Sequence, residues 1–286
     1  MGARACFLGL DVGFSHTRKS TAVAALVIAG REMCLSVRRA TGRSEDVAAA
    51  VREVWDGERI DACAVDGPLR PGLAASAERR PCEQVLTLGV MGKRCRPGEV
   101  VTPQGFRLHE AATAAARMLS PFCQPPPTAS AAAVVPVAGH ALCETFPAAF
   151  IAVLLSEQSL RELDRVPRYR KTGWLYRRLL ASSKLRMLLR LACPGAACEK
   201  VVGAMAKLRN RDEQAAAVCA IAAACFAQCQ FAALGERSGG YIVLPPASAW
   251  DAWARDAVAA NIARLSGGGE AVPELVAIEC GKRSGG

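Results

Sequence analysis

The sequence predicts an α/β protein in which helices flank a mixed central sheet, and three observations lead to this prediction. Apolar segments of strand length occur together with longer segments of helical periodicity. Three of the strand-like segments end on an acidic residue. Hydrophobic residues make up 51% of the 286 residues, which is enough to bury a core of one large domain.

The N-terminal part of the chain gives the clearest order of elements. Residues 6–11, 21–28 and 33–37 are apolar and separated by turn residues, so we expect a three-strand antiparallel meander. Residues 45–55 have helical spacing of valines, and residues 60–65 form a further apolar strand. A strand reached through a crossover helix runs parallel to the first one. This β-β-β-α-β order is the opening of a ribonuclease-H-like fold.

The rest of the chain is expected to extend the same domain. Residues 67–136 are rich in proline and glycine, which predicts an insertion after the strand that ends at Asp66, with a short helix at 108–118. The prediction is a single domain at 1–250, followed at 251–286 by a C-terminal helix and a flexible tail. Further strands are expected at 138–144 and 241–244, and further helices at 148–155, 199–208 and 212–234.

Acidic residues stand at the ends of three apolar segments. Asp11 and Glu144 are the last residues of predicted strands, and Asp66 follows one directly. Ligands of open α/β sheets bind beyond the strand ends, and gathered carboxylates are costly unless a cation lies among them. Carboxylate oxygens are the ligands that Mg²⁺ prefers. Each acid alone is better explained as a strand-end or surface carboxylate, but the three together favour a cation site.

The charge balance favours an anionic partner. The formal net charge is +10, which is common in proteins that bind nucleic acid and also in proteins whose surface is merely basic. Aromatic residues are interleaved with cations around residues 165–190, as suits a nucleic-acid backbone and splayed bases, although a solvated helix face has the same pattern. The predicted nucleic-acid-binding residues are Arg79, Arg80, Lys93, Arg94, Arg168, Arg170, Lys171, Arg177 and Arg178.

Several other classes lack their sequence signals. The 13 cysteines do not show the paired spacing of a structural zinc site, and the segment 9–13 matches neither a P-loop nor a dinucleotide fingerprint. No signal-peptide pattern is visible, and no stretch of 18 uncharged apolar residues occurs. We therefore expect a cytoplasmic protein with no membrane partner and with cysteines present as thiols.

Five short motifs occur in an order that resembles a known family. They resemble the family of uncharacterised proteins described as predicted ribonuclease-H-like nucleases, a domain of unknown function, over about residues 7–246. The motifs are Gly9-Leu10-Asp11-Val12-Gly13-Phe14, Val65-Asp66-Gly67-Pro68-Leu69, Arg80-Pro81-Cys82-Glu83, Glu144-Thr145-Phe146-Pro147-Ala148 and the segment 212–220. The resemblance implies a ribonuclease H fold and a metal-dependent nuclease.

The resemblance also implies a set of ligands. Asp11, Asp66 and Glu144 match the acidic positions of the family, and Asp212 matches more loosely, with Glu213 as an alternative. In a two-metal mechanism the ions lie about 4 Å apart and clamp the attacking water and the leaving oxygen of a phosphodiester. Asp11 is expected to bridge two Mg²⁺ or Mn²⁺ ions, Asp66 and Glu144 to hold one each, and Asp212 to complete the coordination of the second ion.

Two other functions remain open from the sequence. The segment 11–15 followed by a predicted hairpin also resembles the first phosphate loop of actin-like ATPases and sugar kinases. A non-catalytic nucleic-acid-binding module with the same fold is the other alternative. The choice between DNA and RNA, and between endonuclease and exonuclease action, stays open as well.

Overall fold

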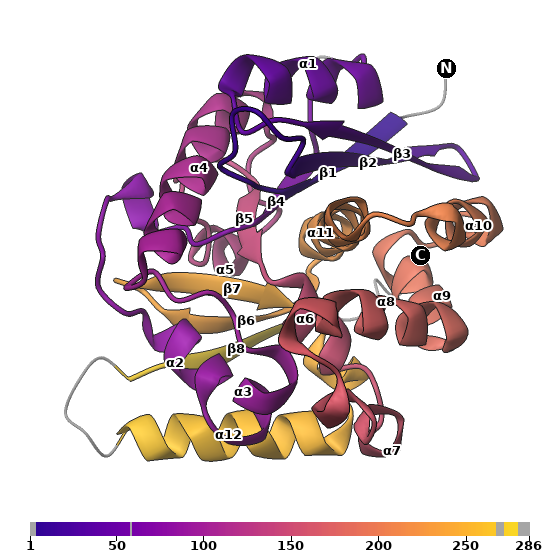
Figure 1. Ribbon diagram of the computed structural model, residues 1–286. Helices are drawn as coiled ribbons and strands as arrows, with labels where there is room; N and C mark the ends of the chain where they lie inside the picture. The colour runs from indigo at the N-terminus through magenta and orange to yellow at the C-terminus, as the bar shows by residue number, and fades with distance from the viewer. Residues whose placement is uncertain (1–3, 58, 267–271, 280–286) are drawn as a thin grey trace.

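All described strands belong to one eight-stranded sheet (Figure 1). The computed structural model describes residues 4–57, 59–266 and 272–279. The strand order in the sheet is β3-β2-β1-β4-β5-β7-β6-β8. The strands are β1 (Arg4–Asp11), β2 (Thr21–Ala29), β3 (Glu32–Ala40), β4 (Ala62–Asp66), β5 (Leu142–Thr145), β6 (Gln230–Glu236), β7 (Gly240–Leu244) and β8 (Glu274–Glu279).

The N-terminal half of the sheet has the predicted order. Strands β1, β2 and β3 form an antiparallel meander, and β4 pairs with β1 in parallel. Strands β5 and β7 continue the parallel part, while β6 and β8 are antiparallel. The sheet is therefore mixed, as the sequence predicts, and the carboxyl ends of β1, β4 and β5 lie at one edge.

Helices cover both faces of the β1–β4 half. On one face, α1 (Ser44–Val54) and α4 (Pro103–Leu119) pack on Leu8, Leu10 and Val65. On the other face lies α11 (Arg211–Ala227), which is buried along almost its whole length (Figure 1). Because side chains alternate between the faces of a strand, Phe7 and Ala64 face α11 while Leu8 and Val65 face α4. This alternation decides which acid faces which helix.

The contact between β1 and α11 is unusually close. A Cβ atom added to Gly9 would lie 2.1 Å from the amide nitrogen of Ala220 and 2.3 Å from the carbonyl oxygen of Ala216. Only glycine on the strand, facing small residues on the helix, allows the two backbones to approach in this way. The alanine-rich composition of α11 is thus explained by its position against the sheet.

Helices α2 (Pro81–Thr87) and α6 (Pro147–Ala152) contact the other half of the sheet. Helix α12 packs on α2 and α3, and its residues Trp253, Ala254 and Val258 are buried. In the described part of the chain, no helix combines the length and apolarity needed to cross a membrane. The remaining helices are α3 (Gly89–Cys95), α5 (Ala129–Ala132), α7 (Glu157–Leu160), α8 (Lys171–Ala181), α9 (Lys184–Ala192), α10 (Glu199–Lys207) and α12 (Ala252–Ser266).

Two C-terminal elements differ from the prediction. The predicted helix at 212–234 ends at Ala227, where Cys229 takes a positive φ of 52° and the chain turns into β6. The segment is apolar throughout, so its pattern does not reveal where the helix stops. Part of the predicted flexible tail forms β8, which pairs with β6.

The insertion at 67–136 contains four α-helices instead of one, and its longest, α4, begins at Pro103 with the Thr102 side chain as cap.

The contact at Gly9 gives a direct test of this packing. Gly9→Ala should lower the free energy of unfolding by about 3 kcal/mol, because the added methyl group overlaps the α11 backbone. Urea unfolding followed by circular dichroism measures the change. Gly203→Ala is the matched control, since the space around Gly203 on α10 is open, and it should stabilise the protein by about 0.5–1 kcal/mol. Equal effects of the two substitutions would contradict the close approach.

Candidate functional site

Asp11 and Asp66 form the centre of the candidate site. They end the parallel neighbours β1 and β4 and are direct partners in the register of these strands. Their carboxyl groups lie close enough that the charge of Asp66 raises the pKa of Asp11. In the described part of the chain, no ion pair involves either residue.

The pair belongs to a row of residues that crosses the sheet. Asp11 is the register partner of Ala22 on β2, and Ala22 is the partner of Arg39 on β3. On the other side, Asp66 is the partner of Thr145 on β5. Partners across strands point to the same face, so Arg39, Asp11 and Asp66 share the face that packs on α11.

Asp212 reaches the pair from the first turn of α11. It lies one helical turn before Ala216, which touches Gly9, and Asp11 follows Gly9 on the same face of β1. The Asn210 side chain caps the helix and accepts hydrogen bonds from the amides of Asp212 (2.8 Å) and Glu213. The close contact of α11 with β1 thus carries Asp212 toward the two strand-end carboxylates.

Two arginines hold Asp212. Its carboxylate lies 3.5 Å from Nη2 of Arg39 and 3.8 Å from Nε of Arg211. The Nε atom of Arg39 is buried and has no hydrogen-bond partner within the described structure. The site therefore contains three acidic side chains and two guanidinium groups. The guanidinium group of Arg39 retains one N–H donor without a partner in the described structure.

Burial raises the pKa values of all three acids. Burial raises the pKa of Asp11 well above its usual range, and the charges of Asp66 and Asp212 raise it further. Burial raises the pKa of Asp66 to about 7, with a further rise from the charge of Glu144, although the hydrogen bond from Asp11 and the charge of Arg211 act in the opposite direction. Burial also raises the pKa of Asp212 against the effect of both arginines. These carboxylates are close enough to compete for ionisation.

Glu144 is placed differently from Asp11 and Asp66. It is the register partner of Val65, not of Asp66, so it points to the other face of the sheet. Its two carboxylate oxygens accept hydrogen bonds from Nη1 and Nη2 of Arg80 at 2.6 and 2.7 Å. Burial raises the pKa of Glu144, while Arg80 opposes this rise. The structure does not bring Glu144 to the aspartate pair as a free ligand.

Arg80 lies in the interior and not on the nucleic-acid-binding surface that the sequence predicts. Only 1% of its surface is exposed. Besides the two bonds to Glu144, its Nε donates to Glu83 at 2.9 Å and its Nη1 donates to the carbonyl of Leu69 at 2.9 Å. A buried guanidinium that is bonded on every side stabilises the loop after β4 and does not contact a ligand.

A basic groove is lined by Arg211, the chain neighbour of Asp212. Its volume is about 620 Å³, and it is lined on one side by Phe146 and Ala148, which follow β5. An adjoining groove of about 630 Å³ shares Arg96 and Arg168 with it and extends to Phe14, just past Asp11. No acidic residue lines the first groove, and half of its twelve lining residues are cationic: Lys93, Arg94, Arg96, Arg168, Lys171 and Arg211.

The predicted cations differ in how freely they face this groove. Arg168 is exposed and lines both grooves, whereas Lys171 donates to the carbonyl of Lys93. Arg94 is buried, stacks 4.3 Å above the Trp253 ring and lies 3.5 Å from Glu157, so it is a structural cation. The groove charge thus comes chiefly from Lys93, Arg96, Arg168, Lys171 and Arg211.

The remaining predicted cations do not line either groove. Arg79 is paired with Glu99 at 3.0 Å, and Arg178 is paired with Glu162 at 2.6 Å. Arg170 stacks 5.3 Å from the ring of Tyr169, and Arg177 is exposed on α8. These four side chains lie on the surface near the groove segments without forming its wall.

Sequence reasoning missed two residues of the site, Arg39 and Arg211. Arg211 adjoins the predicted ligand Asp212, so its position in the chain was a usable signal. Arg39 could be found only from the strand register, which places it in the same row as Asp11. Among residues 4–57, 59–266 and 272–279, no three His, Cys, Asp or Glu side chains converge closely enough to hold a metal ion by themselves.

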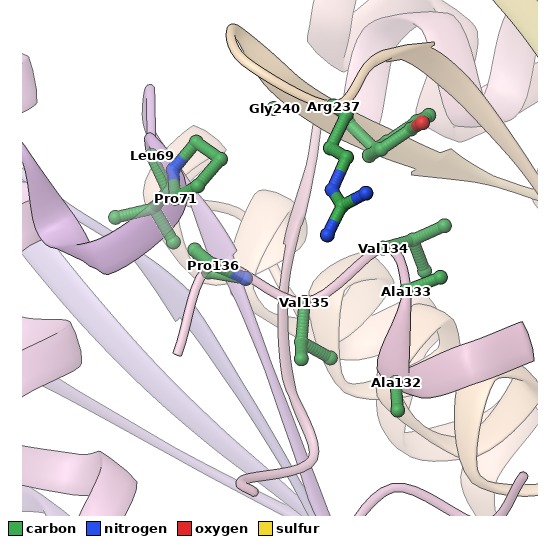
Figure 2. A pocket seen from close by; sticks show the side chains of 10 residues that line it. Leu69, Pro71, Ala132, Ala133, Val134, Val135, Pro136, Arg237 and Gly240 are labelled. Carbon is green, nitrogen blue, oxygen red and sulfur yellow. The ribbon is translucent and has the colours of Figure 1, made fainter. Parts of the chain in front are cut away.

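A separate cavity lies beside the loop that follows β4. It has a volume of about 410 Å³ and is lined by Leu69, Pro71 and the segment 132–136. Figure 2 shows the Arg237 guanidinium, from the β6–β7 turn, pointing into the space next to Val134 and Pro136. None of the four predicted acidic ligands lines this cavity.

Comparisons with known proteins add no relative. No protein-family model, curated protein or solved structure matches the chain. The site is therefore interpreted from its own geometry.

The raised pKa of Asp66 predicts a specific pH dependence of stability. An unfolded aspartate has a pKa of about 3.9, so between about pH 4 and pH 7 the folded protein binds more protons than the unfolded chain. The free energy of unfolding should therefore fall as the pH rises through this window. In metal-free buffer at pH 8, Asp66→Asn should raise the free energy of unfolding by about 1–3 kcal/mol and flatten its pH dependence.

Urea unfolding at pH 5.5 and pH 8 in the presence of a chelator measures both effects. Asp256→Asn, at an exposed position on α12, is the control and should change neither. If Asp66→Asn is no more stable than the unchanged protein at pH 8, the pKa of Asp66 is not raised in the folded protein.

Proposed function

We propose that the chain is a metal-dependent nuclease that hydrolyses phosphodiester bonds of nucleic acid. The observation that carries the proposal is the pair Asp11–Asp66, two strand-end carboxylates in direct register that lack a cationic partner of their own in the described structure. Strand ends of α/β sheets are the usual place for such a site. Asp212 is the third acid of the proposed site, and Mg²⁺ or Mn²⁺ is the proposed cofactor.

The donor set fits a hard divalent cation. Mg²⁺ is commonly held by one or two carboxylates and keeps several waters, so Asp11 and Asp66 suffice as its protein ligands. Burial raises the pKa of both groups, and the charge of Asp66 raises that of Asp11 further, so a cation between them would favour their ionised forms. A bound divalent ion supplies Lewis-acid polarisation of the phosphoryl group and a more acidic bound water.

The cationic residues near the site are suited to binding the phosphate groups of the substrate. An acidic pair repels a phosphodiester, so substrate needs a basic surface beside it. Arg168, Lys171 and Arg211 line the adjacent groove, and Arg39 carries a buried donor with no partner in the described structure. We propose that the groove residues hold the phosphate backbone and that Arg39 and Arg211 orient the phosphate nearest Asp11 and Asp66.

The topology supports a ribonuclease-H-like assignment. The meander β1–β3, the parallel neighbour β4 and the next parallel strand β5 follow the order expected for that fold. We propose membership of the predicted ribonuclease-H-like nuclease family on this topology and on the motifs that carry Asp11 and Asp66. The twelve described cysteines are all free thiols, which supports a reducing, cytoplasmic location.

A cleavage assay tests the proposal. The purified protein should cut labelled DNA, RNA or branched oligonucleotides in Mg²⁺ or Mn²⁺ and not in a chelator. Asp11→Asn and Asp66→Asn should each lower the rate by at least about 100-fold, the loss expected for an essential electrostatic group at the reacting centre. Product mapping on end-labelled strands distinguishes endonuclease from exonuclease action.

The exposed Asp256→Asn variant is the matched control and should cleave at the unchanged rate. Salt-dependent binding without metal-dependent cleavage would instead favour the non-catalytic binding module. Saturable ATP binding without oligonucleotide binding would favour the actin-like alternative. A cleaving activity that survives both aspartate substitutions would contradict the assignment of the site.

The groove predicts how binding responds to salt. Removing one contact to a phosphate reduces the log–log salt slope by about 0.7–0.9. The double variant Arg168→Ala/Lys171→Ala should therefore flatten the slope by about one to two units and weaken binding similarly across sequences. Fluorescence anisotropy at several salt concentrations measures the slope.

The control removes the same charge elsewhere. Arg31→Ala/Arg52→Ala, at two exposed positions outside the groove, should leave the slope within about half a unit of the unchanged protein. Equal flattening by both double variants would mean that net charge, and not the groove, governs binding.

A further inference from the structure

We infer that this site holds one divalent ion and that the Arg80 guanidinium takes the place of a second. The inference rests on the proposed nuclease function and corrects the two-ion arrangement that the sequence predicts. In that arrangement Glu144 is the ligand of an ion. In the structure Glu144 is already neutralised by a buried cation.

The hydrogen bonds of Glu144 leave little room for a metal ion. A carboxylate offers about four lone-pair directions. Oε2 accepts from Nη1 of Arg80 and from the amide of Leu69, both at 2.6 Å, and Oε1 accepts from Nη2 of Arg80 at 2.7 Å. Three of the four directions are therefore used, and all of them lie in a region where Glu144 is 4% exposed.

Freeing Glu144 would be costly for the protein. Arg80 would then retain only Glu83 as a charged partner within the described structure while staying buried. Removing one partner of a buried ion pair is strongly destabilising, because the other charge remains in a region of low dielectric constant. A divalent ion beside the same carboxylate would also be repelled by the guanidinium.

The sheet geometry turns the Glu144 side chain to the face opposite the aspartate pair, although its charge still raises the pKa of Asp66. Asp11 and Asp66 face α11, whereas Glu144 is one residue out of their row and points to the opposite face. Arg80 and Glu144 both bond the backbone of Leu69, three residues after Asp66. They are positioning residues, since they fix the loop that leaves the site and do not reach the proposed ion.

The number of bound ions tests the inference directly. Isothermal titration of the full chain with Mn²⁺ at pH 8 should give one high-affinity ion per chain. Two ions of similar affinity would overturn the inference while leaving the nuclease proposal intact. No bound ion would overturn both, so the two failures are distinguishable.

Variants at Glu144 and Asp66 assign the ion to its ligands. Asp66→Asn should weaken Mn²⁺ binding by at least about 10-fold, the loss expected at a metal ligand or its close support. Glu144→Gln should leave the dissociation constant within about threefold of the unchanged protein, provided that circular dichroism shows a native fold. A folded Glu144→Gln protein that no longer binds Mn²⁺ would overturn the inference. If that variant does not fold, the ion count of the unchanged protein decides alone.

Arg80→Met gives a readout that a purely structural role would not produce. It keeps an unbranched side chain of similar length and leaves Glu144 and Glu83 without their cation. The folded variant should bind two Mn²⁺ ions per chain instead of one. A folded variant that still binds one ion would show that Arg80 does not stand in for a second cation.

Discussion

The close packing of α11 against β1 is the contact on which the rest of the site depends. Gly9 lets the helix backbone approach the strand, and the small side chains of α11 continue that contact along the sheet. The same approach sets the helix N-terminus beside Asp11, so that Asp212 and Arg211 meet the strand-end carboxylates. The packing of Gly9 in the core therefore fixes the position of the charged groups Asp212 and Arg211 at the edge of the sheet.

The charges form two groups on opposite faces of the sheet, although the charge of Glu144 still raises the pKa of Asp66. On the α11 face, Asp11, Asp66 and Asp212 are near two guanidinium groups that only partly neutralise them. On the other face, Arg80 is fully bonded within the protein. The carboxylates of the first group lack full neutralisation, whereas Glu144 in the second group is paired with Arg80. The aspartate group would therefore be stabilised by binding a cation, whereas the Arg80–Glu144 pair stabilises a loop.

Much of the fold could be predicted from the sequence, because the first strands are short, apolar and separated by clear turns. The position of Asp11 and Asp66 at adjacent strand ends followed from that pattern. The role of Glu144 could not be predicted in the same way. The sequence shows where a strand ends, but a shift of one residue in the register decides which face of the sheet a side chain points to. The change from α11 to β6 was hidden for another reason, because both segments are buried on all sides and show no periodicity. The sequence likewise could not show that Arg80 is internal while Arg168 is exposed.

The position of β8 at the edge of the sheet affects the tendency of the protein to self-associate. As the last strand of the sheet, β8 satisfies the outward backbone groups of β6, whose residues Phe231–Leu234 are all buried. A chain shortened before β8 would expose a row of unpaired amides and carbonyls flanked by apolar side chains. Such an edge is a template for pairing between molecules. The charged residue Glu274 on β8, like Arg38 and Arg39 on the opposite edge strand β3, opposes that pairing in the intact protein. Strand β8 thus completes the sheet and also reduces self-association, because it covers the edge of β6.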